Sequence, residues 1–283
     1  MGIYEERGER VEPKRKPFSW RTKCTVPNRG RPLELVYAIG GLSPKGNVSG
    51  VECYNPLEHE WKVLGSVSRH RTGVGVAPLN GSIYAVGGHD GMVCLSSVER
   101  YDPLLNRWCK MAPMNRCRRG LGLAVLDGYL YAVGGSDGYS TLHSVERYNP
   151  LEDRWTPCPP LQTCRENLGC VTFQGKIYVV GGRDDLTELC SVERFDPLAN
   201  EWSAVMPMKS RRSKVSLVAA NGYLLAIGGY DGTVHVTTVE AFDVELNGWR
   251  RFGNTQTCHP GGGVTVIKMA PDYLELSESL WSR

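Results

Sequence analysis

The stretch GGHDGMVCLSSVERYDPLLNRW, residues 87–108, decides the fold because close copies of it recur along the chain. Four columns recur at a step of 47 residues. They are a glycine pair (Gly40, Gly87, Gly134, Gly181, Gly228), a glutamate (Glu52, Glu99, Glu146, Glu193, Glu240), an aromatic residue (Tyr54, Tyr101, Tyr148, Phe195, Phe242) and a tryptophan (Trp61, Trp108, Trp155, Trp202, Trp249). Four columns in register over five copies predict a repeat architecture.

Each unit is predicted to hold four short strands. Val74–Leu79 and Ile83–Val86 are apolar runs joined by Asn80-Gly81, a strong hairpin signal. Val98–Tyr101 alternates apolar and polar residues, and Arg107 begins a fourth strand. Four strands per unit, repeated radially, are typical of a propeller blade. We expect the glycine pairs to permit close backbone approach and the tryptophans to fill the space between blades.

The chain ends predict how the ring closes. Residues 28–32, NRGRP, stand where the first unit needs its first strand, whereas residues 263–267, GVTVI, form an orphan strand after the last unit. The expected fold is therefore an all-β five-bladed propeller, in which the C-terminal strand completes the first blade; six blades are the alternative. The expected boundaries are a charged tail at 1–34, repeats at about 35–70, 71–117, 118–164, 165–211 and 212–258, a closing strand at 259–268 and a tail at 269–283.

The pattern of GGxDG, SVERYDP and NxW resembles the Kelch repeat, and this version is similar to the C-terminal domain of the BTB-Kelch family. That family usually has six repeats. The resemblance implies a module that binds a short acidic or phosphorylated peptide of a target protein for cullin-based ubiquitin ligases; actin binding is the alternative. The family's BTB and BACK domains, which dimerise and hold the cullin, are not in this sequence. We therefore expect a fragment or short isoform that does not recruit a cullin by itself.

The candidate partner-binding residues stand in two loop columns. The loop before each first strand carries an arginine or histidine, and the loop after each glycine pair should share its face. The candidates are Arg71, Thr72, His89, Arg118, Arg119, Ser136, Arg165, Arg183, Arg212, Ser213, Tyr230 and His259. In the BTB-Kelch family the corresponding face binds the peptide. Arginine suits bidentate capture of carboxylate or phosphate, which predicts a cationic cup, most positive around Arg71, Arg118 and Arg119.

A structural interpretation of the same columns stays open. The arginines would then bond loop carbonyls or pair with the glutamate column. The glutamate recurs in every unit, which favours a structural role, with an arginine or exposed backbone N–H groups as its partners.

A cysteine precedes the arginine column at Cys117, Cys164 and Cys258. Nearby positive charge lowers a thiol pKa, so redox sensing is a hypothesis for these residues. Disulfides within this column are not expected, because equivalent loops of different blades should lie beyond the roughly 7 Å limit between Cα atoms.

Composition and motifs exclude several functions. A net charge of +3 is too small to favour nucleic acid, and no run reaches the roughly 18 apolar residues of a membrane span. The N-terminal residues 1–17 lack the apolar core of a secretory signal, so we expect a cytoplasmic protein with reduced thiols, the nucleus and cytoskeleton being alternatives. No P-loop, HExxH or Ser-His-Asp elbow occurs, so no enzyme and no cofactor are expected. A Kelch-type copper oxidase is a remote alternative, since the six histidines are scattered.

Overall fold

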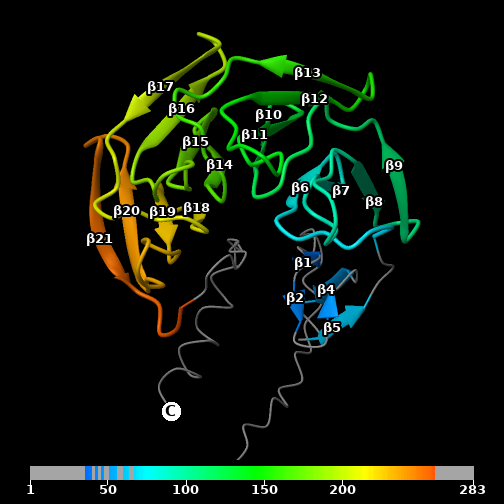
Figure 1. The fold of residues 1–283 in the computed structure, drawn as a ribbon, viewed down its shortest axis with the longest axis horizontal. Helices are drawn as coiled ribbons and strands as arrows, with labels where there is room; N and C mark the ends of the chain where they lie inside the picture. The colour runs from blue at the N-terminus through cyan, green and yellow to red at the C-terminus, as the bar shows by residue number, and fades with distance from the viewer. Residues whose placement is uncertain are drawn as a thin grey trace, which may run out of the picture.

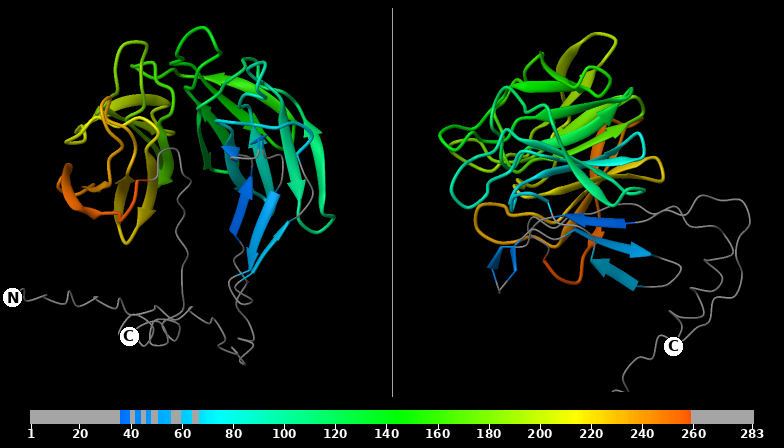
Figure 2. Two further views of the ribbon diagram at one scale, coloured as in Figure 1. Left: turned by 60° about the horizontal axis from the view of Figure 1, so that its bottom comes forward. Right: turned by 90° about the vertical axis from the view of Figure 1, so that its right-hand side faces the viewer.

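The chain forms a ring of five β-sheet blades in a computed structural model (Figure 1). The model describes residues 36–39, 42–43, 46–47, 51–55, 60–63 and 67–258. The regular elements in these residues are all strands. The five-bladed all-β propeller predicted from the repeat is confirmed, rather than the six-bladed alternative. The side views in Figure 2 show that neighbouring blades follow one another in chain order.

Blades 2 to 5 are antiparallel sheets of four strands in sequence order. They comprise β6 (Gly75–Leu79), β7 (Ser82–Val86), β8 (Val98–Asp102) and β9 (Arg107–Met111) in blade 2; β10 (Gly122–Leu126), β11 (Tyr129–Val133), β12 (Val145–Asn149) and β13 (Arg154–Cys158) in blade 3; β14 (Gly169–Phe173), β15 (Lys176–Val180), β16 (Val192–Asp196) and β17 (Glu201–Val205) in blade 4; β18 (Ser216–Ala220), β19 (Tyr223–Ile227), β20 (Thr238–Asp243) and β21 (Gly248–Asn254) in blade 5.

Blade 1 has three described strands, ordered β1 (Val36–Ile39), β4 (Val51–Asn55) and β5 (Glu60–Val63). A short ribbon of β2 (Leu42–Ser43) and β3 (Gly46–Asn47) follows β1. The predicted closing strand at 259–268, the candidate partner-binding residue His259 and both predicted tails lie outside the described residues.

Left-handed turn residues close the inner hairpins of blades 2 to 5. In blade 2 the turn residues Asn80 and Gly81 have φ of 50° and 72°, as a type I′ turn requires, and they join β6 to β7. The glycine pairs follow the second strand. A Cβ on Gly134, whose φ is +60°, would lie 2.6 Å from the carbonyl oxygen of Arg165 in the next blade. The predicted close backbone approach is therefore confirmed.

The hydrophobic core lies between blades rather than within them. Trp155 of blade 3 packs in one cluster with Leu79, Tyr84 and Val98 of blade 2, and its Nε1 donates to Ala112 O at 3.0 Å. Trp202 makes the same bond to Pro159 O one blade further on. Trp249 bonds to Met206 O in the same way. The predicted position is therefore confirmed for Trp155, Trp202 and Trp249, each of which ties its blade to the preceding blade, whereas Trp61 is 53% exposed.

Candidate partner-binding surface

The two predicted loop columns meet at one end of the ring. The backbones of Thr72 and His89 exchange two hydrogen bonds of 2.9 Å, and Arg119 with Ser136 does the same. Glu166–Arg183 and Ser213–Tyr230 repeat this bridge in blades 4 and 5. The loops before the first strands and after the glycine pairs therefore share one surface, as predicted. We call it the loop face; the opposite end, with the hairpin turns, is the turn face.

The arginine column does not belong to that surface, which corrects the predicted cationic cup. The column residues Arg71, Arg118, Arg165 and Arg212 are only 0–1% exposed. Arg71 Nη1 donates to the carbonyl oxygens of Gly87 and Ser97 at 2.7 and 3.0 Å. Its Nη2 donates to Ser97 Oγ and to Glu99 Oε1, the latter at 2.7 Å. A side chain enclosed in this way cannot reach a partner.

The same bonds recur in the other three blades. Arg118, Arg165 and Arg212 bond to Glu146, Glu193 and Glu240 and to the carbonyls of Gly134, Gly181 and Gly228. The third partner is a hydroxyl residue, Ser144, Ser191 or Thr238. The structural interpretation of both columns is therefore confirmed. Each arginine links the loop face to the third strand of its own blade.

The paired glutamates also satisfy backbone donors of the entering loop. Glu146 accepts from Asn115 N at 2.7 Å, and Glu193 accepts from Gln162 N at 2.7 Å. Burial lowers the pKa of Arg118, and the neighbouring Glu146 carboxylate partly restores it. Removing either partner would leave a charge buried without compensation, which is far more costly than losing an exposed pair.

The remaining candidates are placed unevenly on the loop face. Thr72, His89, Arg119 and Tyr230 are partly exposed and Arg183 is exposed. Ser136 and Ser213 are buried. Ser136 and Ser213 thus contribute their backbone bridges to the loop face rather than open side chains.

Three exposed cations of the loop face lie beside carboxylates. Arg69 lies 3.2 Å from Asp90, Arg116 lies 3.4 Å from Asp137, and Arg183 lies 3.4 Å from Glu188. The surface is therefore of mixed charge rather than strongly positive. Arg119 and Lys214 are accessible cations that have no ion pair with another described residue.

Lys214 occupies a strained position next to the central channel. Backbone bonds run from blade to blade there, from Asn167 N to Gly120 O at 2.6 Å and from Lys214 N to Asn167 O at 2.7 Å. The equivalent residues of blades 2 and 3 are Gly73 and Gly120, whereas Lys214 adopts φ of 51°. A left-handed non-glycine residue costs roughly 1–2 kcal/mol. Strained residues cluster at functional positions, so this exposed lysine is a candidate contact.

Sequence reasoning missed the loop tips, which carry the most exposed large hydrophobic side chains of the loop face. Met92, Tyr139 and Leu186 stand five residues after the first glycine of their pairs and are 90%, 100% and 88% exposed. The equivalent residue in blade 5 is Thr233. The signal was available as a column of apolar residues inside polar turns.

The loop tips are held in place by an aspartate in each loop. Asp90 Oδ1 accepts from Met92 N and Val93 N, and Asp137 Oδ1 accepts from Tyr139 N and Ser140 N. The bond from Val234 N, with those from Thr233, lowers the pKa of Asp231 to about 2. These bonds fix the tips before any partner arrives, which reduces the entropy lost on binding.

The Kelch motif model matches residues 34–68, 70–115, 117–162, 164–209 and 211–256, well over half of the chain. The chain belongs to the Kelch family. Its five matched repeats correspond to the five blades. A Kelch propeller is typically a protein-binding scaffold.

The cysteine column consists of Cys117, Cys164 and Cys258, and a thiol pKa lowered by the neighbouring cation was the hypothesis for it. The structure does not bear this out at every position. Burial raises the pKa of Cys164, and the carboxylates of Asp185 and Asp184 raise it further. Arg165 lowers this pKa only slightly, since its side chain faces the interior. The hypothesis that a neighbouring cation activates the thiol is therefore wrong for Cys164. Cys258 is exposed and donates to His235 O at 3.4 Å.

Two further observations concern the described part of this Kelch chain. None of its secondary structure is a helix long and apolar enough to traverse a bilayer. No three histidine, cysteine, aspartate or glutamate side chains in it are grouped so that they would hold a metal ion.

Proposed function

We propose that the loop face of this propeller binds a short segment of a target protein, with the loop tips Met92, Tyr139 and Leu186 as its apolar anchors. The observation that carries the proposal is the combination of exposure and rigidity at these tips. A fully exposed aromatic side chain on a hydrogen-bonded loop gains contact area at little conformational cost.

Arg119 and Lys214 define the charge of the segment that fits. Both are accessible, and arginine suits a planar carboxylate or phosphate. His89, Arg183 and Tyr230 lie in the same loops and provide additional polar contacts. An acidic or phosphorylated segment with one or two apolar residues matches this surface.

The resemblance to BTB-Kelch proteins extends the proposal to a role. The bound segment would belong to a substrate that is presented for ubiquitin transfer. The cullin would be held by a BTB domain rather than by the propeller. Replacing the wild-type gene product by a loop-tip variant should then lengthen the half-life of the target in cells. Actin co-sedimentation tests the cytoskeletal alternative.

Proximity labelling with paired variants tests the binding surface. The loop-tip variant carries Met92→Ser, Tyr139→Ser and Leu186→Ser. The control carries Leu104→Ser, Leu151→Ser and Leu198→Ser, which are equally exposed leucines on the turn face. We expect specific targets to be lost with the loop-tip variant and retained with the control. The reverse pattern would assign binding to the turn face.

A further inference from the structure

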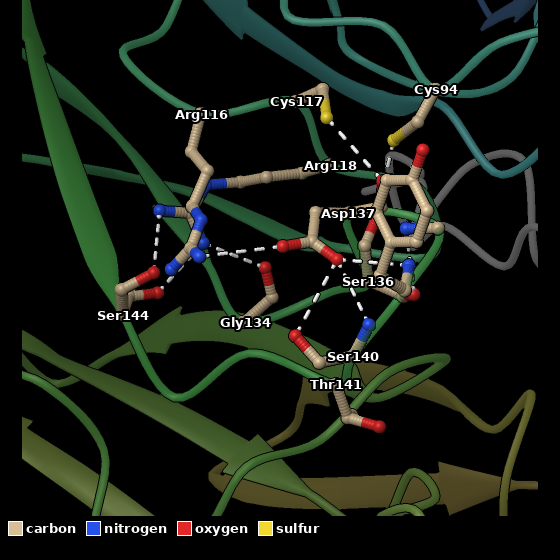
Figure 3. A network of polar contacts seen from close by, with 12 residues as sticks. Cys94, Arg116, Cys117, Arg118, Gly134, Ser136, Asp137, Ser140, Thr141 and Ser144 are labelled. Carbon is tan, nitrogen blue, oxygen red and sulfur yellow. Dashed lines mark hydrogen bonds and ion pairs between the residues drawn. The ribbon is translucent and has the colours of Figure 1, made fainter.

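Two cysteines from neighbouring blades lie together beneath the loop face. Cys94 belongs to the loop between β7 and β8, and Cys117 belongs to the segment that enters blade 3. Arg118 N donates to Leu95 O at 3.1 Å, so the two segments run side by side. The Cys94 thiol donates to Ser136 O at 3.3 Å, and the Cys117 thiol donates to Asp137 O at 3.5 Å (Figure 3).

The two thiols bond to the carbonyl oxygens of consecutive residues, Ser136 and Asp137, so they lie close to each other. Burial raises the pKa of Cys94 to about 12, and the neighbouring Cys117 thiol adds to this shift. Both residues are partly exposed, and Cys94 lines a cavity together with Ser68 and Arg69. A small oxidant therefore has access to the pair.

The other blade junctions show that the fold does not require this pair. The same backbone bond joins Arg165 to Leu142 and Arg212 to Leu189. The residues equivalent to Cys94 and Cys117 are Thr141 with Cys164, Glu188 with Arg211 and His235 with Cys258. Among the junctions between blades 2 and 5, only that between blades 2 and 3 brings two thiols together.

We propose that Cys94 and Cys117 form a redox-active pair, which a peroxide converts into a disulfide between blades 2 and 3. A disulfide requires two neighbouring thiols, with Cα atoms roughly 4.4–6.8 Å apart, and these two thiols already bond to the carbonyls of consecutive residues, Ser136 and Asp137. This proposal concerns the thiols alone and does not depend on what the loop face binds.

The reaction has two balanced steps. The sulfur of Cys117 attacks one oxygen of hydrogen peroxide, which forms a sulfenic acid and releases water after proton transfer. The Cys94 sulfur then displaces the hydroxyl group of the sulfenic acid, its proton leaving with that group as a second water. In total, two thiols lose two hydrogen atoms and one peroxide is reduced to two waters; a thiol such as glutathione reverses the change.

The raised pKa of Cys94 sets the order of these steps. Cys94 is largely protonated at neutral pH, and the thiolate is the nucleophilic form. Burial of the Cys94 thiol favours the order in which the other thiol of the pair reacts with peroxide and Cys94 resolves the sulfenic acid.

The test is peroxide treatment of the full chain, followed by alkylation under denaturing conditions and mass spectrometry. We expect the loss of two free thiols and a linked peptide pair containing Cys94 and Cys117, both reversed by glutathione. With Cys94→Ser the link should disappear and dimedone should label Cys117. Thermal melting of each variant verifies that it is folded.

Cys164→Ser is the matched control, because Cys164 occupies the position of Cys117 one blade later, where Thr141 stands at the position of Cys94. It should leave the Cys94–Cys117 link unchanged. The proposal is overturned if both thiols stay free after peroxide treatment, if either pairs with a different cysteine, or if folded Cys94→Ser gives no dimedone adduct at Cys117.

Discussion

Arg165 Nη2 lies 2.8 Å from Glu193 Oε1, and the two side chains are 0% and 3% exposed. The first residue belongs to the loop entering blade 4, and the second belongs to its third strand, β16. The Arg165 carbonyl oxygen accepts from Gly135 N of the preceding blade at 2.9 Å. One arginine therefore bonds its own blade through its side chain and the neighbouring blade through its backbone.

Truncating this arginine should destabilise the whole domain. Arg165→Ala leaves Glu193 buried without its cation, and breaking such a pair typically costs about 3–5 kcal/mol. Arg154→Ala is the control, because its pair with Glu152 is exposed and should contribute at most about 1 kcal/mol. Urea unfolding measures both variants. Equal, small losses would show that the buried pair is not structural.

A methyl group at the blade centre should be far more damaging than one at a turn. Gly134→Ala brings a Cβ to 2.6 Å from Arg165 O, whereas Gly128→Ala meets nothing within 4 Å. Both glycines have positive φ, at +60° and +79°, so both variants carry a similar backbone strain of roughly 1–2 kcal/mol. The excess loss of stability in Gly134→Ala measures the close approach of the blades. Identical unfolding midpoints would contradict it.

Replacing Lys214 should separate stability from binding. Lys214→Gly relieves the left-handed strain, and we expect the unfolding free energy to stay constant or rise by up to about 1 kcal/mol. Lys214→Gln keeps the backbone strain and also removes the charge. Both variants should weaken binding of an acidic segment to the same extent, measured by fluorescence polarisation. A Lys214→Gly protein less stable than Lys214→Gln would refute the strain argument.

Acid should loosen the loop of blade 5 in a defined pH range. Backbone and Thr233 hydrogen bonds lower the pKa of Asp231 from 3.8 to about 2. A depressed pKa in the folded state contributes stability above pH 3.8, and this contribution is lost as the pH falls towards 2. The wild type should therefore melt at a higher temperature than Asp231→Asn at pH 6, with the gap closing near pH 2. A constant gap would contradict the assignment.

The sequence predicted the fold well because the five copies of the repeat can be aligned with one another. Asn80-Gly81 specifies a hairpin, and the glycine pair specifies the end of the second strand, so strand positions followed within one or two residues. The spacing of 47 residues then placed every other blade. It also placed the two loop columns on one face, which the Thr72–His89 bridge confirms.

The site could be predicted only in part. A column of arginines shows that the residue repeats, but it does not show whether the side chains point into the blade or towards solvent. The Arg71 side chain points inward, where the Glu99 carboxylate and two backbone carbonyl oxygens accept its hydrogen bonds. Cys94 and Cys117 belong to different columns, so their contact depends on how blade 3 lies against blade 2. Spacing within one column contains no information about that contact.

The most direct measurement of the central claim is the affinity of a recovered target for Tyr139→Ala, with Leu151→Ala on the turn face as the control. Isothermal titration gives the dissociation constant of each. An exposed aromatic anchor that becomes buried on binding contributes on the order of 2 kcal/mol or more, so Tyr139→Ala should weaken binding by more than about tenfold. Leu151→Ala should leave it unchanged. Binding that is unaffected by Tyr139→Ala but weakened by Leu151→Ala would contradict a binding site on the loop face.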